Sequence, residues 1–297
     1  MVDITSRKDQ RALANLRATL GQQGSGRLRY AAAMHFNRKG LLSNEALEVF
    51  RICSPDDGED PGGLLRDRGL TVPLLDVEVT SPELCIRSLV DEVDRYLSAL
   101  ESPGVAEVRM GIAEARERSL NLPKSRGNKV VSSFLDATLT ALEDTHPALS
   151  GAIRAAAPLL HWVTYDDYPP EEIGPDFRMG HAFASLVGGG APIPADDYDL
   201  GLFLIAPHVF YRDHRHAAPE LYAPLTGPHG WRFGPDMPLI SRPAHQPVWN
   251  EPFAPHATKV GPIPFLCIFG WTRDVAESAT VIPASDWAEL DALRLTA

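Results

Sequence analysis

The chain has 297 residues, 44% hydrophobic and 23% charged, which is ordinary for a globular protein with a sizeable core. Its 28 basic and 39 acidic residues leave a formal net charge of −11, so it would repel phosphate, and nucleic acid and anionic membranes are excluded as partners. No apolar run reaches the length of a membrane span, and the polar N-terminus lacks the apolar core of a secretory signal.

The cysteine pattern indicates a reducing compartment. Cys53, Cys85 and Cys267 are widely separated, lie in apolar surroundings and form no CxxC pair. This is typical of buried, reduced thiols rather than of a disulfide framework. We therefore expect a cytoplasmic protein. A homodimer is kept among the expectations, although no motif addresses the oligomeric state.

The first half of the chain is predicted to be helical. Leu13, Leu16 and Leu20 form one stripe of the first helix, and Leu84, Leu89, Val93 and Leu97 are expected to point inward from a later one that begins at Ser81-Pro82-Glu83. An acidic, Gly/Pro-rich segment at 54–63 is expected to be an exposed loop, and 70–79 is ambiguous. The predicted helices are residues 6–20, 27–36, 43–52, 81–100, 105–118, 129–142 and 148–162.

After about residue 165 the pattern changes to short apolar runs separated by turn residues, which favours a β-sandwich or barrel. The glycine-rich segment 188–192 lacks the Lys-Ser/Thr ending of a phosphate loop and is interpreted as a turn. A short helix is expected to close the chain at 285–293. The predicted strands are residues 182–187, 200–206, 231–233, 239–241, 248–249 and 265–271.

One stretch of this second half concentrates side chains that bind metals. His214 and His216 are two apart, so on a β-strand both imidazoles point to one face, and Glu220 and Gly227 follow. The spacing matches the first motif of the cupin superfamily, except that His208 stands where the motif has its leading glycine.

A weaker form of the second cupin motif follows downstream. His256 ends the segment Pro252-Phe-Ala254-Pro-His, in which Ala254 replaces a glycine, and Val260 stands where asparagine is common. The resemblance implies an α+β chain, with a helical N-terminal domain (1–165) and a C-terminal cupin, double-stranded β-helix (jelly-roll) barrel (166–297). Three imidazoles and one carboxylate suit Zn, Fe, Mn, Ni or Co and leave a coordination position for substrate.

Two tyrosines narrow the resemblance. Tyr211 and Tyr222 complete the pattern Tyr-xx-His-x-His-xxx-Glu-x-Tyr, with Trp231 further on. Over about 180–271 the chain resembles the cupin-type dimethylsulfoniopropionate (DMSP) lyases and their wider superfamily. Known members also carry a helical region before the barrel.

The resemblance implies metal-dependent β-elimination of DMSP to dimethyl sulfide and acrylate. It implies Tyr222 as the base and Tyr211 as a substrate-positioning group or alternative base; for each, a buried aromatic without chemistry is the alternative. The alternatives for the whole chain are another cupin metalloenzyme acting on a different small carboxylate, such as an isomerase or a dioxygenase, and a non-catalytic small-molecule-binding cupin. The metal ligands implied are His214, His216, Glu220 and His256.

The other polar and aromatic residues of this half receive weaker interpretations. Aromatic faces attract cations, so four aromatic residues are candidates for a wall around the sulfonium, although core packing is the alternative for each: Trp231, Trp249, Trp271 and Phe253. Surface or supporting roles, rather than ligation, are expected for His181, His208, His229 and His245. A solvated turn is the expectation for Asp196, Asp197 and Asp199. Arg232 and Lys259 are weak candidates for binding a substrate carboxylate.

Overall fold

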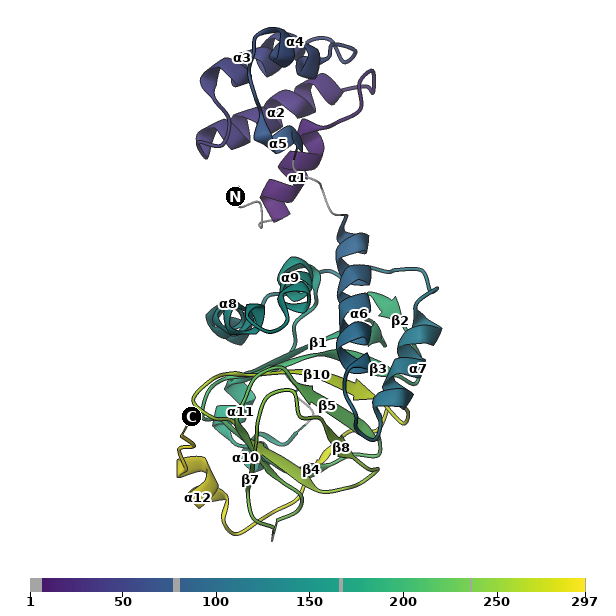
Figure 1. The fold of residues 1–297 in the computed structure, drawn as a ribbon, viewed down its shortest axis with the longest axis vertical. Helices are drawn as coiled ribbons and strands as arrows, with labels where there is room; N and C mark the ends of the chain where they lie inside the picture. Colours follow the sequence, from purple (N-terminus) through teal and green to yellow (C-terminus); the bar gives the residue numbers. More distant parts are fainter. Residues whose placement is uncertain (1–6, 77–80, 166–167, 236, 297) are drawn as a thin grey trace. The chain divides into compact units, whose positions relative to one another are not determined.

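The computed structural model describes residues 7–76, 81–165, 168–235 and 237–296, and the chain divides into two compact units, 1–81 and 82–297. The first unit is helical, and side chains such as Leu16, Phe36 and Phe50 form its buried core. Its elements, labelled in Figure 1, are α1 (Arg7–Leu16), α2 (Ser25–Arg38), α3 (Asn44–Cys53), α4 (Pro61–Asp67) and α5 (Pro73–Asp76).

Two predictions for this unit need correction. The expected loop at 54–63 ends in helix α4, because the Asp60 side chain accepts the N–H groups of Gly62 and Gly63 and Pro61 occupies the first helical turn. Leu20 lies beyond the end of α1 and is 47% exposed. The ambiguous segment contains α5, and its residues 77–80 lie outside the described chain.

The second unit begins with helices close to the predicted ones. Leu89, Val93 and Leu97 are buried as expected, but Leu84 is 53% exposed. Five positions at 100° per residue place Leu84 roughly 140° around the helix from Leu89, outside the buried stripe. The helices of this unit are α6 (Pro82–Ser98), α7 (Val105–Ala115), α8 (Lys129–Glu143), α9 (Pro147–Ala156), the 3₁₀ helix η1 (Ala157–Leu159), α10 (Pro170–Ile173), α11 (Pro175–Met179) and α12 (Trp287–Ala292).

Two mostly antiparallel sheets form the barrel. The first has the order β2-β1-β3-β10-β5-β8 and the second β11-β4-β9-β6-β7. The strands are β1 (His181–Gly188), β2 (Ile193–Pro194), β3 (Asp199–Ile205), β4 (Phe210–Arg215), β5 (Glu220–Pro224), β6 (His229–Arg232), β7 (Ile240–Arg242), β8 (Val248–Asn250), β9 (His256–Lys259), β10 (Phe265–Trp271) and β11 (Thr280–Val281). The predicted α+β class and the cupin-type double-stranded β-helix are confirmed.

The six-stranded sheet is buried on both faces. Along β3, Leu200, Leu202 and Leu204 pack into the core formed with helices α6 to α9, which cover this face (Figure 1). Phe203 and Ile205 alternate with them and point into the space between the two sheets. The inner face of this sheet therefore supplies side chains to the interior of the barrel.

The predicted domain boundary at residue 165 stays a prediction. The compact unit that contains the barrel begins at residue 82 and includes α6 to α9, so helix content and compactness divide the chain at different points.

Cys53, Cys85 and Cys267 are free and buried, as expected. Over the described ranges, the helices are too short or too polar to cross a bilayer.

Candidate metal centre

Three histidines converge inside the barrel. His214 on β4 and His256 on β9 are direct partners in the antiparallel register, and His216 follows β4 by one residue. Their potential ligand atoms lie within 4.8 Å of one another, and the residues are 1%, 0% and 3% exposed, respectively. The strand register brings the distant His256 to the two histidines of the first motif.

Backbone carbonyls orient all three rings. The Nδ1 atoms of His214, His216 and His256 lie 2.8, 2.7 and 2.9 Å from carbonyl oxygens two residues away in the chain. A carbonyl only accepts, so each Nδ1 carries a proton, and a neutral ring then has its lone pair on Nε2. The Nε2 atoms of His214 and His256 are buried and have no hydrogen-bond partner among the described residues. Buried, unpaired ring nitrogens this close together fit a bound metal ion.

Glu220, the first residue of β5, approaches two of these histidines from the opposite sheet. Its Oε2 lies 3.2 Å from His216 Nε2 and 3.3 Å from His256 Nε2. Trp271 Nε1 donates to Oε1 at 2.7 Å, and Asn250 Nδ2 donates to Oε2 at 3.2 Å. Two side-chain donors therefore hold the carboxylate with one oxygen towards the histidines.

The electrostatics of the four residues also fit a cation. Burial and the neighbouring imidazoles hold the pKa of His214 well below its usual value, so that ring is neutral. Burial would raise the pKa of Glu220, but His216 and His256 outweigh it and hold that pKa well below the usual range. For His216, burial lowers the pKa, but the Glu220 carboxylate more than offsets this effect, so the pKa of His216 is raised overall. An anionic carboxylate beside imidazole lone pairs is a donor set for a divalent transition metal.

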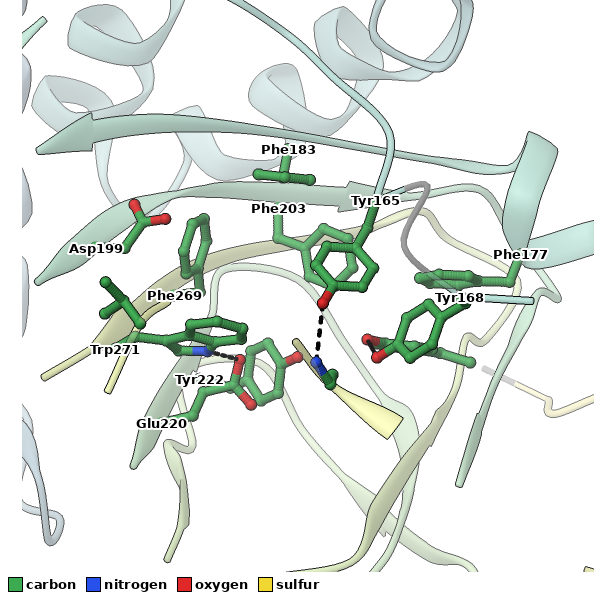
Figure 2. A pocket seen from close by; sticks show the side chains of 13 residues that line it. Tyr165, Tyr168, Phe177, Phe183, Asp199, Phe203, Glu220, Tyr222, Phe269 and Trp271 are labelled. Carbon is green, nitrogen blue, oxygen red and sulfur yellow. Dashed lines mark hydrogen bonds between the residues drawn. The ribbon is translucent and has the colours of Figure 1, made fainter. Parts of the chain in front are cut away.

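An aromatic pocket of about 180 Å³ adjoins this cluster. Of the thirteen described residues that line it, nine are aromatic, and Glu220 is the one predicted ligand among them (Figure 2). The three histidines are not among the described lining residues, but two of them contact the lining: His214 stacks on the Tyr211 ring at 3.9 Å between centroids, and the His216 ring lies 4.7 Å from the Trp271 ring.

Both predicted catalytic tyrosines line the pocket. Tyr222 lies two residues after Glu220 on β5 and therefore on the same face of the strand. The Tyr211 hydroxyl lies 2.6 Å from the Tyr168 hydroxyl. Burial raises the pKa of both Tyr211 and Tyr222 well above the ordinary value, and the Glu220 carboxylate raises that of Tyr222 further.

Sequence reasoning missed several residues of the pocket. In the sequence, Tyr165 and Tyr168 mark only the change from predicted helices to predicted strands, yet both line the pocket. The Tyr165 hydroxyl accepts a hydrogen bond from the Ala279 N–H at 2.9 Å. Asp199 also lines the pocket, whereas Asp196 is an exposed turn residue as predicted. The sequence could have placed Asp199 in the pocket, because strand alternation puts it on the face of β3 opposite to the Leu residues.

The four residues of the predicted aromatic wall do not lie together in the structure. Trp271 lines the pocket, but the other three candidates are absent from its described lining. Trp231 is 1% exposed and lies behind Tyr222, at 5.5 Å between ring centroids. Trp249 packs where a Cβ on Gly104 would sit, and Phe253 is 54% exposed.

The basic candidates for a substrate carboxylate are also engaged elsewhere. Arg232 is buried in ion pairs with Asp213 and Asp286. The Lys259 ammonium donates to the carbonyl oxygens of His208 and Asp291, at 2.7 and 3.1 Å. Neither residue is among the described residues that line the pocket.

The four additional histidines all lie outside the metal cluster, as interpreted. His181 and His229 are buried rather than on the surface: His181 accepts the Tyr165 N–H and contacts the Phe177 carbonyl, and His229 accepts the Gly261 N–H. His245 contacts the Tyr96 hydroxyl, and His208 is partly exposed.

Comparison with known proteins decides the family. The sequence profile of the dimethylsulfoniopropionate lyase family matches residues 106–267, more than half of the chain. The chain belongs to the DMSP lyase family. The match runs from α7 into β10 and includes the three histidines, Glu220 and both tyrosines.

The chain is also similar to individual proteins. The dimethylsulfoniopropionate lyase DddQ of Ruegeria pomeroyi is 28% identical over 154 residues, which cover 52% of this chain and 72% of that protein. A chain from the crystal structures of the DMSP lyases RdDddP and RnDddQII has a TM-score of 0.53 at 20% identity, over 68% of this chain and 100% of that one. The crystal structure of DddQ from Ruegeria pomeroyi DSS-3 has a TM-score of 0.48 at 19% identity, over 66% and 95%. The structural likeness concerns the fold.

Proposed function

We propose that this protein is a metal-dependent carbon–sulfur lyase that cleaves DMSP to dimethyl sulfide and acrylate, with Tyr222 as the base. Membership of the DMSP lyase family supports the substrate. The observation that carries the mechanism is that Glu220 and Tyr222, neighbours on one face of β5, join the buried histidine cluster to the aromatic pocket.

His214, His216, Glu220 and His256 would hold one divalent transition-metal ion, of the group Zn, Fe, Mn, Ni and Co. When bound, such an ion supplies a Lewis acid that makes the α-proton of a substrate carboxylate more acidic and favours the phenolate of a nearby tyrosine. The four residues fit this role because their lone pairs and the carboxylate oxygen converge inside the barrel.

Tyr222 then removes the α-proton of DMSP. The electron pair of the Cα–H bond forms the Cα=Cβ double bond, the Cβ–S bond breaks, and its electron pair leaves with sulfur as dimethyl sulfide. The carbon product is acrylate, and the proton stays on the tyrosine oxygen. Burial and Glu220 raise the pKa of Tyr222, so its phenol stays protonated until a positive charge offsets them. Activity is therefore expected to require the metal.

Tyr211 is assigned to substrate positioning. Its hydroxyl is paired with that of Tyr168, and its ring stacks between Phe177 and His214 at 3.9 Å from each centroid. This packing holds Tyr211 rigidly at the wall of the pocket, whereas Tyr222 lies two residues after the proposed metal ligand Glu220 on the same strand.

The free, buried thiols fit the cytoplasmic location predicted from the sequence.

The test is headspace dimethyl sulfide from metal-loaded protein supplied with DMSP. Tyr222→Phe is expected to keep its metal and lose about 100- to 10,000-fold in rate, the usual contribution of a general base. Tyr96→Phe is the matched control, because Tyr96 is also a buried tyrosine but contacts His245 rather than the pocket.

Full activity of metal-loaded Tyr222→Phe would remove the base assignment. If wild-type protein releases no more sulfide than His216→Ala with any of the five metals, DMSP is not the substrate. The isomerase, dioxygenase and non-catalytic binding alternatives would then be tested with other small carboxylates and by oxygen consumption.

A further inference from the structure

One carboxylate in the pocket has no part in the proposed reaction. Asp199 begins β3 and lies directly opposite Trp271 of β10, which in turn lies opposite Glu220 of β5. Residues opposite one another in neighbouring strands point to the same face, so Asp199 and Glu220 flank Trp271 on the inner face of the sheet. Two strand spacings separate their Cα atoms by about 10 Å.

Aromatic rings line the pocket beside this carboxylate. Figure 2 shows Asp199, Phe269 and Trp271 at one end of the pocket. The Phe269 ring lies over Gly201, the next inward position on β3: a Cβ there would be 2.7 Å from Phe269 Cε1. The Phe183 ring packs against Phe269 edge to face, at 6.2 Å between centroids.

No basic side chain of the described residues is paired with this carboxylate. Asp199 is partly exposed as a residue, but its Oδ1 has almost no solvent contact and no hydrogen-bond partner within the described part of the chain. Burial, offset in part by a hydrogen bond from Ser185 to the carboxylate, raises the pKa of Asp199 to about 7. A buried acceptor without a partner, at the wall of a pocket, is stabilised by a ligand that brings positive charge.

We propose that Asp199 and the rings of Phe183, Phe269 and Trp271 form a cation subsite that binds the sulfonium end of the substrate. This inference rests on the proposed function, which directs the substrate carboxylate to the histidine end of the pocket. The subsite combines a formal negative charge with aromatic faces, both of which attract an onium group. It selects small carboxylates with a positively charged β-substituent over uncharged ones of equal shape.

The test uses two isosteric ligands. The first is 3-(trimethylammonio)propanoate, and the second is 4,4-dimethylpentanoate, in which carbon replaces the positively charged nitrogen. Both keep the carboxylate and the two-carbon spacer, so the ratio of their dissociation constants isolates the effect of the charge. Calorimetry on metal-loaded protein measures this ratio without turnover, so the result is independent of whether DMSP is cleaved.

Wild-type protein is expected to prefer the ammonium ligand, and Asp199→Asn to reduce that preference about tenfold, as expected for the loss of one partly solvated charge pair. Asp196→Asn is the matched control, since it removes the same charge three residues away on the exposed turn. Phe183→Leu, which removes one ring, is expected to reduce the preference by a smaller factor.

A merely structural role of Asp199 would weaken both ligands equally and leave the ratio unchanged. An unchanged ratio in Asp199→Asn would overturn the subsite, as would wild-type protein that binds the neutral ligand as well as the cation or fails to bind the cation. If Asp199→Asn does not fold, the ratio of the two dissociation constants in Phe183→Leu decides, and an unchanged ratio overturns the subsite.

Discussion

Trp271 offers a sharp test of how the proposed metal centre is held. Its indole N–H donates to Glu220 Oε1 at 2.7 Å, and Glu220 is 2% exposed. Trp271→Phe keeps an aromatic ring but leaves that carboxylate oxygen without its donor. Hydrogen bonds to charged groups contribute about 1.5 to 3 kcal/mol. At 1.4 kcal/mol per factor of ten, metal affinity is expected to fall about 10- to 100-fold, the range seen when a partner of a metal ligand is removed.

The assay is competition for zinc with a chromophoric chelator. Trp249→Phe is a matched control, because Trp249 Nε1 also donates to a glutamate, Glu251, at 2.8 Å, but that pair is exposed. The control is expected to keep wild-type zinc affinity. Equal affinities of Trp271→Phe and wild type, or an equal loss in Trp249→Phe, would refute the reasoning that Trp271 orients the ligand.

Three further outcomes are expected. Asp213→Asn should lower the free energy of unfolding in urea by about 3 kcal/mol, because it leaves the Arg232 guanidinium, 1% exposed, with Asp286 as its remaining carboxylate. Affinity for 3-(trimethylammonio)propanoate should rise as the pH passes upward through about 7, since Asp199 then ionises, and this rise should be missing in Asp199→Asn. Gly201→Ala should destabilise the fold by about 1 to 3 kcal/mol, because its Cβ would lie 2.3 Å from the Ala184 carbonyl oxygen.

The proximity of the candidate metal ligands was predictable because most of their geometry is local. His214, His216 and Glu220 fall within seven residues, and strand alternation alone places the two imidazoles together. His256 required the family resemblance, since only the β4–β9 register makes it the partner of His214. The helices were predictable for the same reason: their apolar stripes are local patterns.

The rest of the pocket depends on register between strands far apart in the sequence. Asp199 faces the pocket because β3 pairs with β10, and in the sequence it looks like one of three aspartates in a turn. Trp231 looked equivalent to Trp271, but it lies on β6 of the other sheet, behind Tyr222. Sequence periodicity gives the face of a strand but not its neighbours, so it could not separate these cases.

The candidate ligands are held in place by two different kinds of partner. Backbone carbonyls two residues away hold the three imidazoles, and every residue type supplies such a carbonyl. Glu220 instead depends on the side chains of Trp271 and Asn250. Substitutions of the side chains that carry these carbonyls therefore keep the hydrogen bonds to the imidazoles, whereas a change at Trp271 or Asn250 removes one of the two donors to the carboxylate. As relatives of this protein diverge in sequence, the three histidines should keep their arrangement longer than the glutamate does. A divergent relative would therefore first lose the carboxylate ligand and keep a site of three histidines.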